Sequence, residues 1–294
     1  MNLSSSTTPR VCAVVVTYNP NPSFVENIAA VRVQADHVVV VDNGSSNATE
    51  AHLHELESRQ GCTVIRNRQN LGIAAALNLG VKHAMDAGFD WVATFDQDSR
   101  VSDGFIATML ETYRQAPNPE SVAVISPSYV DHESGVHARM QWDRNGGLLK
   151  TMTSGNMIPS AVLRRIGAFD ESLFIDQVDT EFCLRARREG MLILQSPAIL
   201  FHALGRTTYH RLFGYDFEVT NHSAGRRYYM TRNTLRLLRC YRSDRQWVSS
   251  ECYLFITGLI AIALVEDHRW QKFRAVLSGA LDALKGKTGK RFEL

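Results

Sequence analysis

The hydrophobic and polar positions of the first 130 residues form two alternating patterns. Short runs rich in β-branched residues are separated by stretches whose apolar residues recur at helical spacing, such as 73–87 and 104–116. Because alternating strands and helices connect through right-handed crossovers, the pattern predicts an α/β fold, a mostly parallel sheet with helices on both faces. The runs expected to form buried strands are 11–18, 37–42, 62–67, 91–96 and 122–127.

The pattern changes after about residue 130. A polar stretch leads into TSGNMIP, a helix-like AVLRRIG and FDESLFIDQVDTEFCLRARREG, and LILQSPAILFHALG is expected to return to the sheet. From about residue 220 the spacing is helical, with helices predicted to about Tyr241, over 247–265 and over 268–285. We therefore predict a flexible N-terminus over 1–10, an α/β domain over 11–215 and a helical C-terminal region over 216–294.

Composition narrows the class of protein. With 294 residues, 45% of them hydrophobic, the chain can fill a core, and its formal charge of +2 gives no reason to expect a nucleic-acid partner. The charge is uneven, however, because 16 basic and 8 acidic residues follow residue 203, a net charge of +8. The question of a charged partner therefore belongs to the C-terminal third.

Cysteine usage and apolar runs indicate the compartment. The five cysteines have no paired spacing, and the first ten residues lack the apolar stretch of a secretory signal, so we expect a reduced, cytoplasmic chain. The longest apolar run, 252–265, has 14 residues, fewer than the roughly 20 that span a bilayer. A buried or interfacial helix is expected there.

Polar side chains follow four of the predicted strands. Asn, Asp and Gly are ordinary turn residues, so one such strand end needs no functional explanation. Four of them at the carboxyl edge of one sheet indicate a ligand site, because ligands of α/β sheets bind at that edge. The residues are Thr17, Tyr18 and Asn19, then Asp42, Asn43 and Gly44, then Asn67 and Asn70, and finally Asp96, Gln97 and Asp98.

Asp96 and Asp98 form the sharpest pair among these residues. Residues two apart on an extended backbone project to the same side, so both carboxylates can reach one divalent cation. Without a cation the two charges would repel and one pKa would rise. His202, at the end of an apolar run, is either a core histidine or a third ligand through a neutral imidazole. The pair predicts a Mg²⁺ or Mn²⁺ site.

Asp42 has two possible roles. Its carboxylate can accept the imide N–H of a uracil or thymine, with Thr17 and Asn19 lining a nucleoside pocket, or it can cap a helix near Asn47 or complete an Asx turn. No GxGxxG follows the first strand and no GxxxxGK[ST] occurs, which disfavours dinucleotide oxidoreductases and P-loop NTPases.

A second carboxylate cluster contains Asp176, Asp179 and Glu181. If a helix begins near Val178, Asp179 lies in its first turn, where the helix dipole favours an anion and alone could explain the residue. The functional alternative is a general base that takes the proton of an attacking hydroxyl.

The motifs together resemble a known family. VVVTYNP, VVVDNGS, NRQNLGIAAALNLG, FDQDS, TSGNMIP, FIDQVDTEFCLR and FHALG occur in this order over about residues 11–208. They resemble the inverting family 2 glycosyltransferases, which have the Rossmann-like GT-A fold, and FIDQVDTEFCLR with RRYYMTRN is most similar to the bacterial dTDP-rhamnosyltransferases. The resemblance implies Mg²⁺- or Mn²⁺-dependent transfer of L-rhamnose from dTDP-β-L-rhamnose to a saccharide acceptor of lipopolysaccharide or another cell-surface polysaccharide.

The resemblance also implies residue roles. Val178 stands where many members have Glu, which leaves the choice of base between Asp179 and Asp176 open. The implied donor site contains Thr17, Tyr18, Asn19, Asp42, Asn43, Asn70, Gly72, Asp96, Gln97 and Arg232, with Asn233 beside it; the metal site Asp96, Asp98 and His202; the catalytic position Asp179; and the acceptor site Gly155, Asn156 and Asp176.

The basic C-terminal helix has three possible roles. Its apolar stripe could cover the core, contact the inner membrane surface peripherally, where lipid-linked acceptors would be met, or form a homodimer interface. The stripe consists of Trp270, Phe273, Leu277, Leu281 and Leu284, with Arg269, Lys272 and Arg274 near its start and Lys285, Lys287, Lys290 and Arg291 after it.

Three other functions compete with rhamnosyl transfer. An inverting transferase could use a UDP-hexose, and a nucleotidyltransferase would share the sheet and the acidic ligands. The second lacks its expected Gly-rich, Lys-containing N-terminal loop here. A catalytically silent saccharide-binding module is disfavoured because both the metal pair and the candidate base are present.

Overall fold

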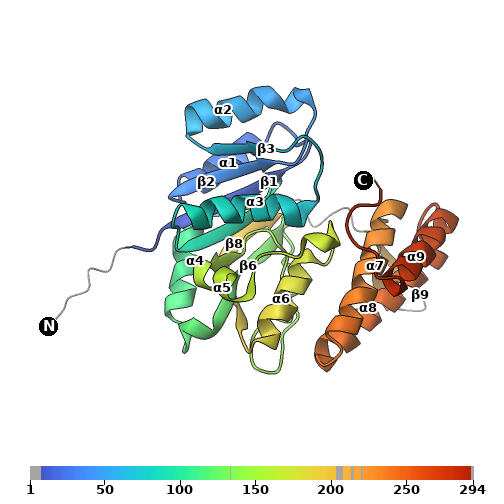
Figure 1. Ribbon diagram of the computed structural model, residues 1–294. Helices are drawn as coiled ribbons and strands as arrows, with labels where there is room; N and C mark the ends of the chain where they lie inside the picture. Colours follow the sequence, from blue (N-terminus) through green and yellow to red (C-terminus); the bar gives the residue numbers. More distant parts are fainter. Residues whose placement is uncertain (1–7, 133, 203–207, 213–214, 220, 293–294) are drawn as a thin grey trace.

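The computed structural model describes residues 8–132, 134–202, 208–212, 215–219 and 221–292. An eight-stranded sheet with the order β3-β2-β1-β4-β7-β6-β8-β5 forms the body of the molecule (Figure 1). The predicted strands are confirmed within a few residues. They are β1 (Val11–Thr17), β2 (His37–Asp42), β3 (Thr63–Arg66), β4 (Trp91–Asp96), β6 (Val122–Asp131) and β8 (Leu192–His202).

Two short strands make the sheet mixed. β3, β2, β1 and β4 are parallel, as are β6 and β8, but β7 (Met157–Pro159) runs antiparallel between β4 and β6. β5 (Arg100–Val101) pairs antiparallel with β8. Strands of three and two residues are too short for a periodic pattern, so the sequence analysis missed both and overstated the parallel character of the sheet.

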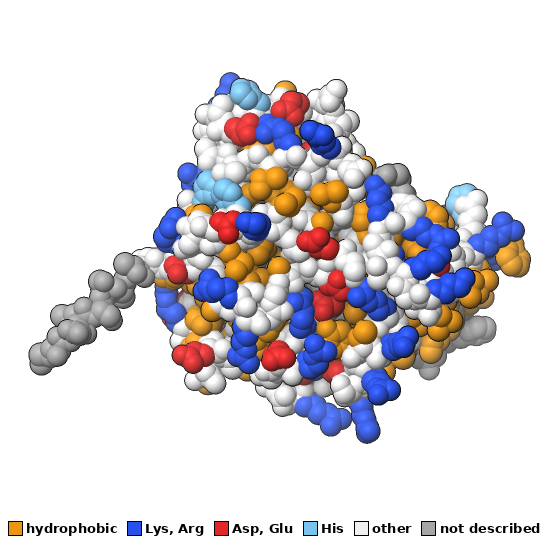
Figure 2. Space-filling view, in the orientation of Figure 1, with side chains coloured by type: hydrophobic (Ala, Val, Ile, Leu, Met, Phe, Trp, Pro, Cys, Tyr) orange, Lys and Arg blue, Asp and Glu red, His pale blue; other side chains and the backbone are white. Residues whose placement is uncertain are grey.

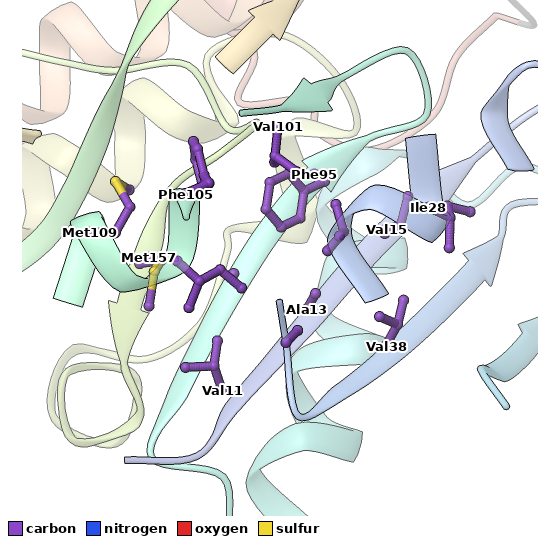
Figure 3. Packing of buried hydrophobic residues seen from close by; sticks show 14 of the residues in the cluster. Val11, Ala13, Val15, Ile28, Val38, Phe95, Val101, Phe105, Met109 and Met157 are labelled. Carbon is purple, nitrogen blue, oxygen red and sulfur yellow. The ribbon is translucent and has the colours of Figure 1, made fainter. Parts of the chain in front are cut away.

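Both faces of the sheet are covered by helices, as predicted. In β1, Val11, Ala13 and Val15 belong to one hydrophobic cluster, and Cys12, Val14 and Val16 belong to the other. Figure 3 shows part of the first cluster, in which Phe105 and Met109 of a helix pack beside Phe95 and Met157. α1 (Phe24–Arg32), α2 (Glu50–Gln60) and α4 (Phe105–Arg114) contribute to the first cluster, and α3 (Ile73–Asp86), α5 (Ser160–Ile166) and α6 (Val178–Arg188) contribute to the second.

The C-terminal region is helical, as expected. α7 (Ala224–Cys240), α8 (Arg245–Leu264) and α9 (Arg269–Leu284) lie together beside the sheet domain in Figure 1. The expected boundary after residue 215 falls inside an antiparallel hairpin of β9 (Thr208–Leu212) and β10 (Tyr215–Val219). Residues 1–7 of the expected N-terminal segment, and 203–205 of the FHALG motif, lie outside the described residues.

α8 is longer than the apolar run inside it. Among the described residues it is the one helix long and apolar enough to cross a membrane by length and composition, and 22% of its apolar window is buried. Its first turns are held against the rest of the chain, because Trp247 is buried with Leu184, Leu237 and Tyr241. Glu251 is buried as well and pairs with Lys150 over 2.8 Å.

Candidate active site

Three predicted metal ligands lie together at the carboxyl edge of the sheet. Asp96 ends β4, Asp98 follows it, and His202 ends β8; one potential ligand atom from each lies within 4.8 Å of the others. The pairing of β5 with β8 explains how distant parts of the chain meet, since Arg100 lies opposite Phe201, next to His202. His202 Nδ1 is 3.4 Å from Asp98 Oδ1.

Two serines that the sequence analysis did not single out support this cluster. Ser99 Oγ lies 2.9 Å from His202 Nδ1 and 2.6 Å from Ser154 Oγ. Ser154 Oγ in turn accepts the N–H of Asp96 over 3.0 Å. Such contacts fix the orientation of ligating side chains. Both serines lie within motifs quoted above, FDQDS and TSGNMIP, but nothing in the sequence alone pairs them.

The electrostatics of the cluster favour a cation. The pKa of Asp96 is raised to about 6, chiefly by burial; the charge of His202 opposes this rise and the neighbouring Asp98 carboxylate adds to it. Two carboxylates and an imidazole are a donor set that suits Mg²⁺ or Mn²⁺. The residues therefore fit a divalent cation, which when bound would supply Lewis-acid stabilisation of phosphate oxygens.

Asp42 lies buried at the end of β2. Its Oδ1 accepts the hydroxyls of Thr17 (3.1 Å) and Ser45, and its Oδ2 accepts the N–H of Ser45 over 3.0 Å. The turn role that the sequence left open is therefore present. A carboxylate has about four lone-pair sites, so these three contacts leave room for one further donor.

The ends of β1 and β4 are joined by Gln97. Its side-chain amide accepts the N–H of Tyr18 over 2.8 Å and donates to the Tyr18 carbonyl over 3.4 Å. Asn19 has a left-handed φ of 45° and accepts the N–H of Ser46 over 2.9 Å. These contacts place Tyr18, Asn19 and Gln97 at one edge with Asp42 and give Gln97 a role in shaping that edge.

A network of amide side chains joins β2 to the start of α3. Asn43 Nδ2 donates to Asn70 Oδ1 over 3.1 Å, and Asn43 Oδ1 accepts from Asn67 Nδ2 over 3.1 Å. Gly72 has a φ of +90°, and a Cβ there would lie 2.5 Å from the carbonyl oxygen of Phe174. Only glycine fits at this position, where the 70–72 loop contacts the segment before the second carboxylate cluster.

The second carboxylate cluster lies near the first. α6 begins at Val178, as predicted, and Asp179 Oδ1 accepts the N–H of Thr180 over 2.7 Å. Burial raises the pKa of Asp179, and the charge of Lys150 lowers it. A backbone hydrogen bond from Thr153 also lowers the pKa of Asp179, and the next residue, Ser154, accepts the N–H of Asp96, so Asp179 and Asp96 lie on either side of the same loop.

Asp176 and Glu181 differ from Asp179. Asp176 Oδ1 accepts Arg226 Nε over 3.1 Å, and its Oδ2 is buried with no hydrogen-bond partner among the described residues. Burial raises the Asp176 pKa. Glu181 pairs with Arg185 over 2.8 Å and accepts the Tyr241 hydroxyl over 2.7 Å, which is a structural role. Asp176 and Asp179 remain the two candidates for the base.

α7 holds the backbone segment that precedes the candidate base. Phe174, Asp176 and Gln177 have φ values of 65°, 62° and 66°, a strained conformation for non-glycine residues. Asn233 Nδ2 lies 3.0, 2.8 and 2.9 Å from the carbonyl oxygens of residues 173, 175 and 176. We call residues 173–177 the carboxylate segment; its strain is offset by these contacts.

Arg232 and Asn233 make contacts inside the protein that the sequence did not predict. Both are buried, and the Arg232 guanidinium donates to the carbonyls of Leu173 (3.0 Å) and Gly289 (2.7 Å) and to Asn233. All three of its nitrogens are used inside the protein. Both residues thus hold the segment that precedes the candidate base, and their contact with the donor or acceptor stays a prediction.

Gly155 and Asn156, the predicted acceptor residues, lie in the loop after residue 152. Both are buried, and the Asn156 amide donates to the Met152 carbonyl over 2.7 Å. Gly155 has a φ of +81°, and a Cβ there would lie 2.7 Å from Pro127. These residues shape the loop that carries Ser154, and their contact with the acceptor stays a prediction.

Comparison with known proteins defines the class. The family described as Glycosyl transferase family 2 matches residues 12–173, more than half of the chain. The chain belongs to this family and is a glycosyltransferase.

Two relatives with named sugar-transfer activities are similar to this chain. The chain is 29% identical over 296 residues to the dTDP-rhamnosyl transferase RfbF of Shigella flexneri, a match that covers 95% of this chain and 97% of that relative. It is 29% identical over 207 residues to the galactofuranosyltransferase GlfT1 of Mycolicibacterium smegmatis, covering 62% and 66%. The likeness to rhamnosyltransferases that the motifs indicated is confirmed.

Solved structures share the fold. The mannosyltransferase PcManGT from Pyrobaculum calidifontis, in complex with GDP-Man and Mn²⁺, matches with a TM-score of 0.61 and 16% identity, covering 96% of this chain and 89% of that one. TarS of S. aureus matches with a TM-score of 0.56 and 14% identity, covering 94% and 49%. The expected GT-A fold is thereby confirmed.

Proposed function

We propose that the protein transfers L-rhamnose from dTDP-β-L-rhamnose to a saccharide acceptor, with inversion at the anomeric carbon. The observation that carries this proposal is the cluster of Asp96, Asp98 and His202 at the edge of the sheet, with Asp179 beside it through the 153–154 backbone that also contacts Asp96. Similarity to RfbF over nearly the whole of both chains supports the choice of donor.

In this proposal the nucleotide lies along the strand ends. Thr17, Tyr18, Asn19 and Asp42 contact the nucleoside, and Asn70 with Gly72 lies beside the ribose and diphosphate, supported by Asn43 and Gln97. Asp96, Asp98 and His202 would hold Mg²⁺ or Mn²⁺, which when bound offsets the charge of the departing diphosphate.

Asp179 acts as the general base on the acceptor side. Its carboxylate takes the proton of the attacking hydroxyl, and the oxygen forms its bond to the anomeric carbon as the bond to the diphosphate breaks on the opposite face. The raised pKa of Asp179 makes it a stronger base than an exposed carboxylate. Asp176 borders the acceptor and is the alternative base.

The acceptor belongs, in this proposal, to lipopolysaccharide or another cell-surface polysaccharide assembled on the cytoplasmic face of the inner membrane. This class of acceptor rests on the resemblance of the sequence motifs, whereas the relative RfbF, a dTDP-rhamnosyl transferase, supports only the sugar that is transferred. The five cysteines are free in the structure, in keeping with a reduced compartment.

A donor screen tests the proposal. Purified protein is incubated with dTDP-β-L-rhamnose, UDP-hexoses and GDP-mannose, with and without EDTA, and released nucleotide is measured. We expect turnover of dTDP-β-L-rhamnose that EDTA abolishes, and stronger competition by dTDP than by UDP. Preference for UDP would replace rhamnose with a hexose, and pyrophosphate release from a nucleoside triphosphate would indicate a nucleotidyltransferase.

A further inference from the structure

α9 is an amphipathic helix whose apolar face points outward. Trp270, Leu277 and Leu284 are 80%, 62% and 78% exposed, and Leu281 is exposed as well. These residues recur at helical spacing and define one stripe, which we call the α9 stripe. Phe273, the fifth residue of the predicted stripe, is half-buried, but the four others face outward, so the stripe as a whole does not cover the core, which was the first of the three roles considered above.

The polar face of α9 is buried because the rest of the C-terminal region satisfies it. Lys272 Nζ pairs with the buried Glu266 over 2.8 Å. Asp282 accepts the Tyr228 hydroxyl over 2.9 Å. Gly279 lets α9 approach α7, since a Cβ there would lie 2.6 Å from the Tyr228 carbonyl oxygen. Rotating the helix to bury the stripe would leave these charges without partners, so the outward orientation is fixed.

The surroundings of the α9 stripe are strongly basic. Seven Lys and Arg residues occur between residues 269 and 291; of these, Lys272 is buried against Glu266, and Lys287 and Arg291 pair with the buried Asp282, the one acidic residue of this range. Arg269, Arg274 and Lys285 are exposed on the same helix or at its end. Figure 2 shows Lys and Arg side chains gathered with hydrophobic ones over the α7–α9 side of the molecule.

We infer that the α9 stripe docks on the surface of a membrane that contains anionic lipid. Trp270 and the three leucines enter the boundary between headgroups and acyl chains, and Arg269, Arg274 and Lys285 contact lipid phosphates. A second copy fits this face less well, because a two-fold interface would place the same cations opposite each other with no exposed acidic residue of α9 to pair them.

The docking has a consequence for the candidate active site. α9 packs against α7 at Gly279, and α7 holds the carboxylate segment through Asn233. A membrane under α9 would therefore keep Asp176 and Asp179 at a fixed height above the lipid surface. This inference does not depend on which sugar nucleotide is the donor.

Vesicle flotation of the full chain tests the inference. The probes are vesicles of phosphatidylcholine alone and of phosphatidylcholine mixed with phosphatidylglycerol. The double variant Trp270→Ser with Leu277→Ser removes two side chains of the stripe, and Val33→Ser, 83% exposed at the end of α1, is the matched control. We expect binding to the mixed vesicles only, reduced at least about tenfold in the double variant and unchanged in the control.

Tryptophan fluorescence gives an independent readout. Trp91 and Trp247 are buried and Trp142 is half-exposed, so in a Trp142→Phe background Trp270 is the exposed indole among the four tryptophans. A blue shift of its emission on adding mixed vesicles is expected. Donor hydrolysis in solution serves as the check on folding and should stay within about twofold in the double variant.

Two outcomes would overturn the inference. One is equal flotation of the double variant and the wild type, or no binding of the wild type to mixed vesicles. The other is a concentration-dependent dimer in light scattering that the double variant abolishes while vesicle binding stays the same, which would assign the stripe to a second copy. Either result would leave the donor screen unaffected.

Discussion

The two halves of the candidate active site are built in different ways. The strand-end half, with Asp42, Asp96 and Asp98, is formed by residues directly at the ends of neighbouring strands, so the sheet itself positions them. The carboxylate segment depends on Asn233, which lies 57 to 60 positions away in the sequence. The first half needs only the sheet to form, whereas the second needs the C-terminal helices to be docked.

This difference predicts how substitutions in each half affect activity and stability. A substitution at a strand end should remove one chemical function and leave the fold intact. A substitution in α7 should loosen the carboxylate segment, whose left-handed residues store strain, and so change both rate and stability. The C-terminal helices therefore support the candidate active site, because α7 holds the carboxylate segment and α9 packs against α7.

The largest effect is expected for Asp179→Asn. An amide cannot take the acceptor proton, so transfer should fall by about 10²- to 10⁴-fold, while the donor dissociation constant stays within about twofold. Product formation and isothermal titration with donor measure the two quantities. Asp86→Asn, on the exposed end of α3, is the matched control.

The same experiment on Asp176→Asn separates the two candidate bases. Asp176 already accepts Arg226, so its loss should reduce transfer less than the loss of Asp179 does. Wild-type transfer by Asp179→Asn together with loss of transfer in Asp176→Asn would make Asp176 the base.

Removal of the metal is the next largest effect. Asp96→Asn should abolish tight Mn²⁺ binding and lower donor turnover by at least about 10²-fold, because a neutral amide is a poor replacement for a carboxylate ligand. Mn²⁺ titration followed by electron paramagnetic resonance measures the binding. Unchanged Mn²⁺ affinity in Asp96→Asn would show that Asp96 is not a ligand of the metal.

Ser99→Ala should weaken Mn²⁺ binding about 10-fold or more, because the Ser99 hydroxyl orients the imidazole of His202.

A smaller effect is expected for Asn233→Ala in the other half. Three carbonyl oxygens, one buried and two partly buried, would lose their shared donor, which costs about 1–3 kcal/mol of unfolding free energy. We expect kcat to fall about 10-fold or more while the donor KM changes little, because the strand-end half is untouched. Urea unfolding and steady-state kinetics measure both, with the exposed Asn118→Ala as control. A change confined to donor KM would contradict the positioning role.

The two halves also differ in how far the sequence predicts them. The β-branched runs of β1, β2 and β4 and the DxD spacing of Asp96 and Asp98 predict the sheet, its edge and the metal pair, because the relevant contacts follow from strand neighbours. Arg232 and Asn233 could be recognised in the sequence as a motif, but nothing in one chain shows that they point at backbone carbonyls of residues 173–176.

α3 and α9 show that the spacing of apolar residues predicts a helix but not which of its faces is buried. Both have an apolar stripe at helical spacing, but α3 buries Leu77 and Val81 under the sheet, and α9 exposes Leu277 and Leu284. Periodicity predicts that a helix forms, and the polarity of its neighbours decides which face is buried. For α9 the neighbours are Glu266 and Tyr228, which bind its polar face.

The smallest expected effect is the pH dependence of the stability of the metal-free protein. The pKa of Asp96 is about 6 in the folded chain, against an ordinary 3.8, so between about pH 4 and 6 the folded state binds more protons than the unfolded state. Stability from this group is present at low pH and is lost as the pH rises through 6. The loss should be on the order of 1 kcal/mol, reduced by the partial exposure of Asp96.

Urea unfolding with EDTA at several pH values measures this dependence. Asp176 and Asp179, whose pKa values are also raised, act in the same direction, so the difference between wild type and Asp96→Asn isolates Asp96. Asp96→Asn should be the more stable protein above pH 6, and the gap should close toward pH 4. Added Mn²⁺ should reverse the order by stabilising only the wild type, increasingly as the proton leaves Asp96. If the metal-free wild type and Asp96→Asn show parallel pH profiles, Asp96 keeps an ordinary pKa. In that case ionised Asp96 would not destabilise the metal-free protein, and a cation would have no such cost to offset. Strain would then be confined to the backbone of the carboxylate segment.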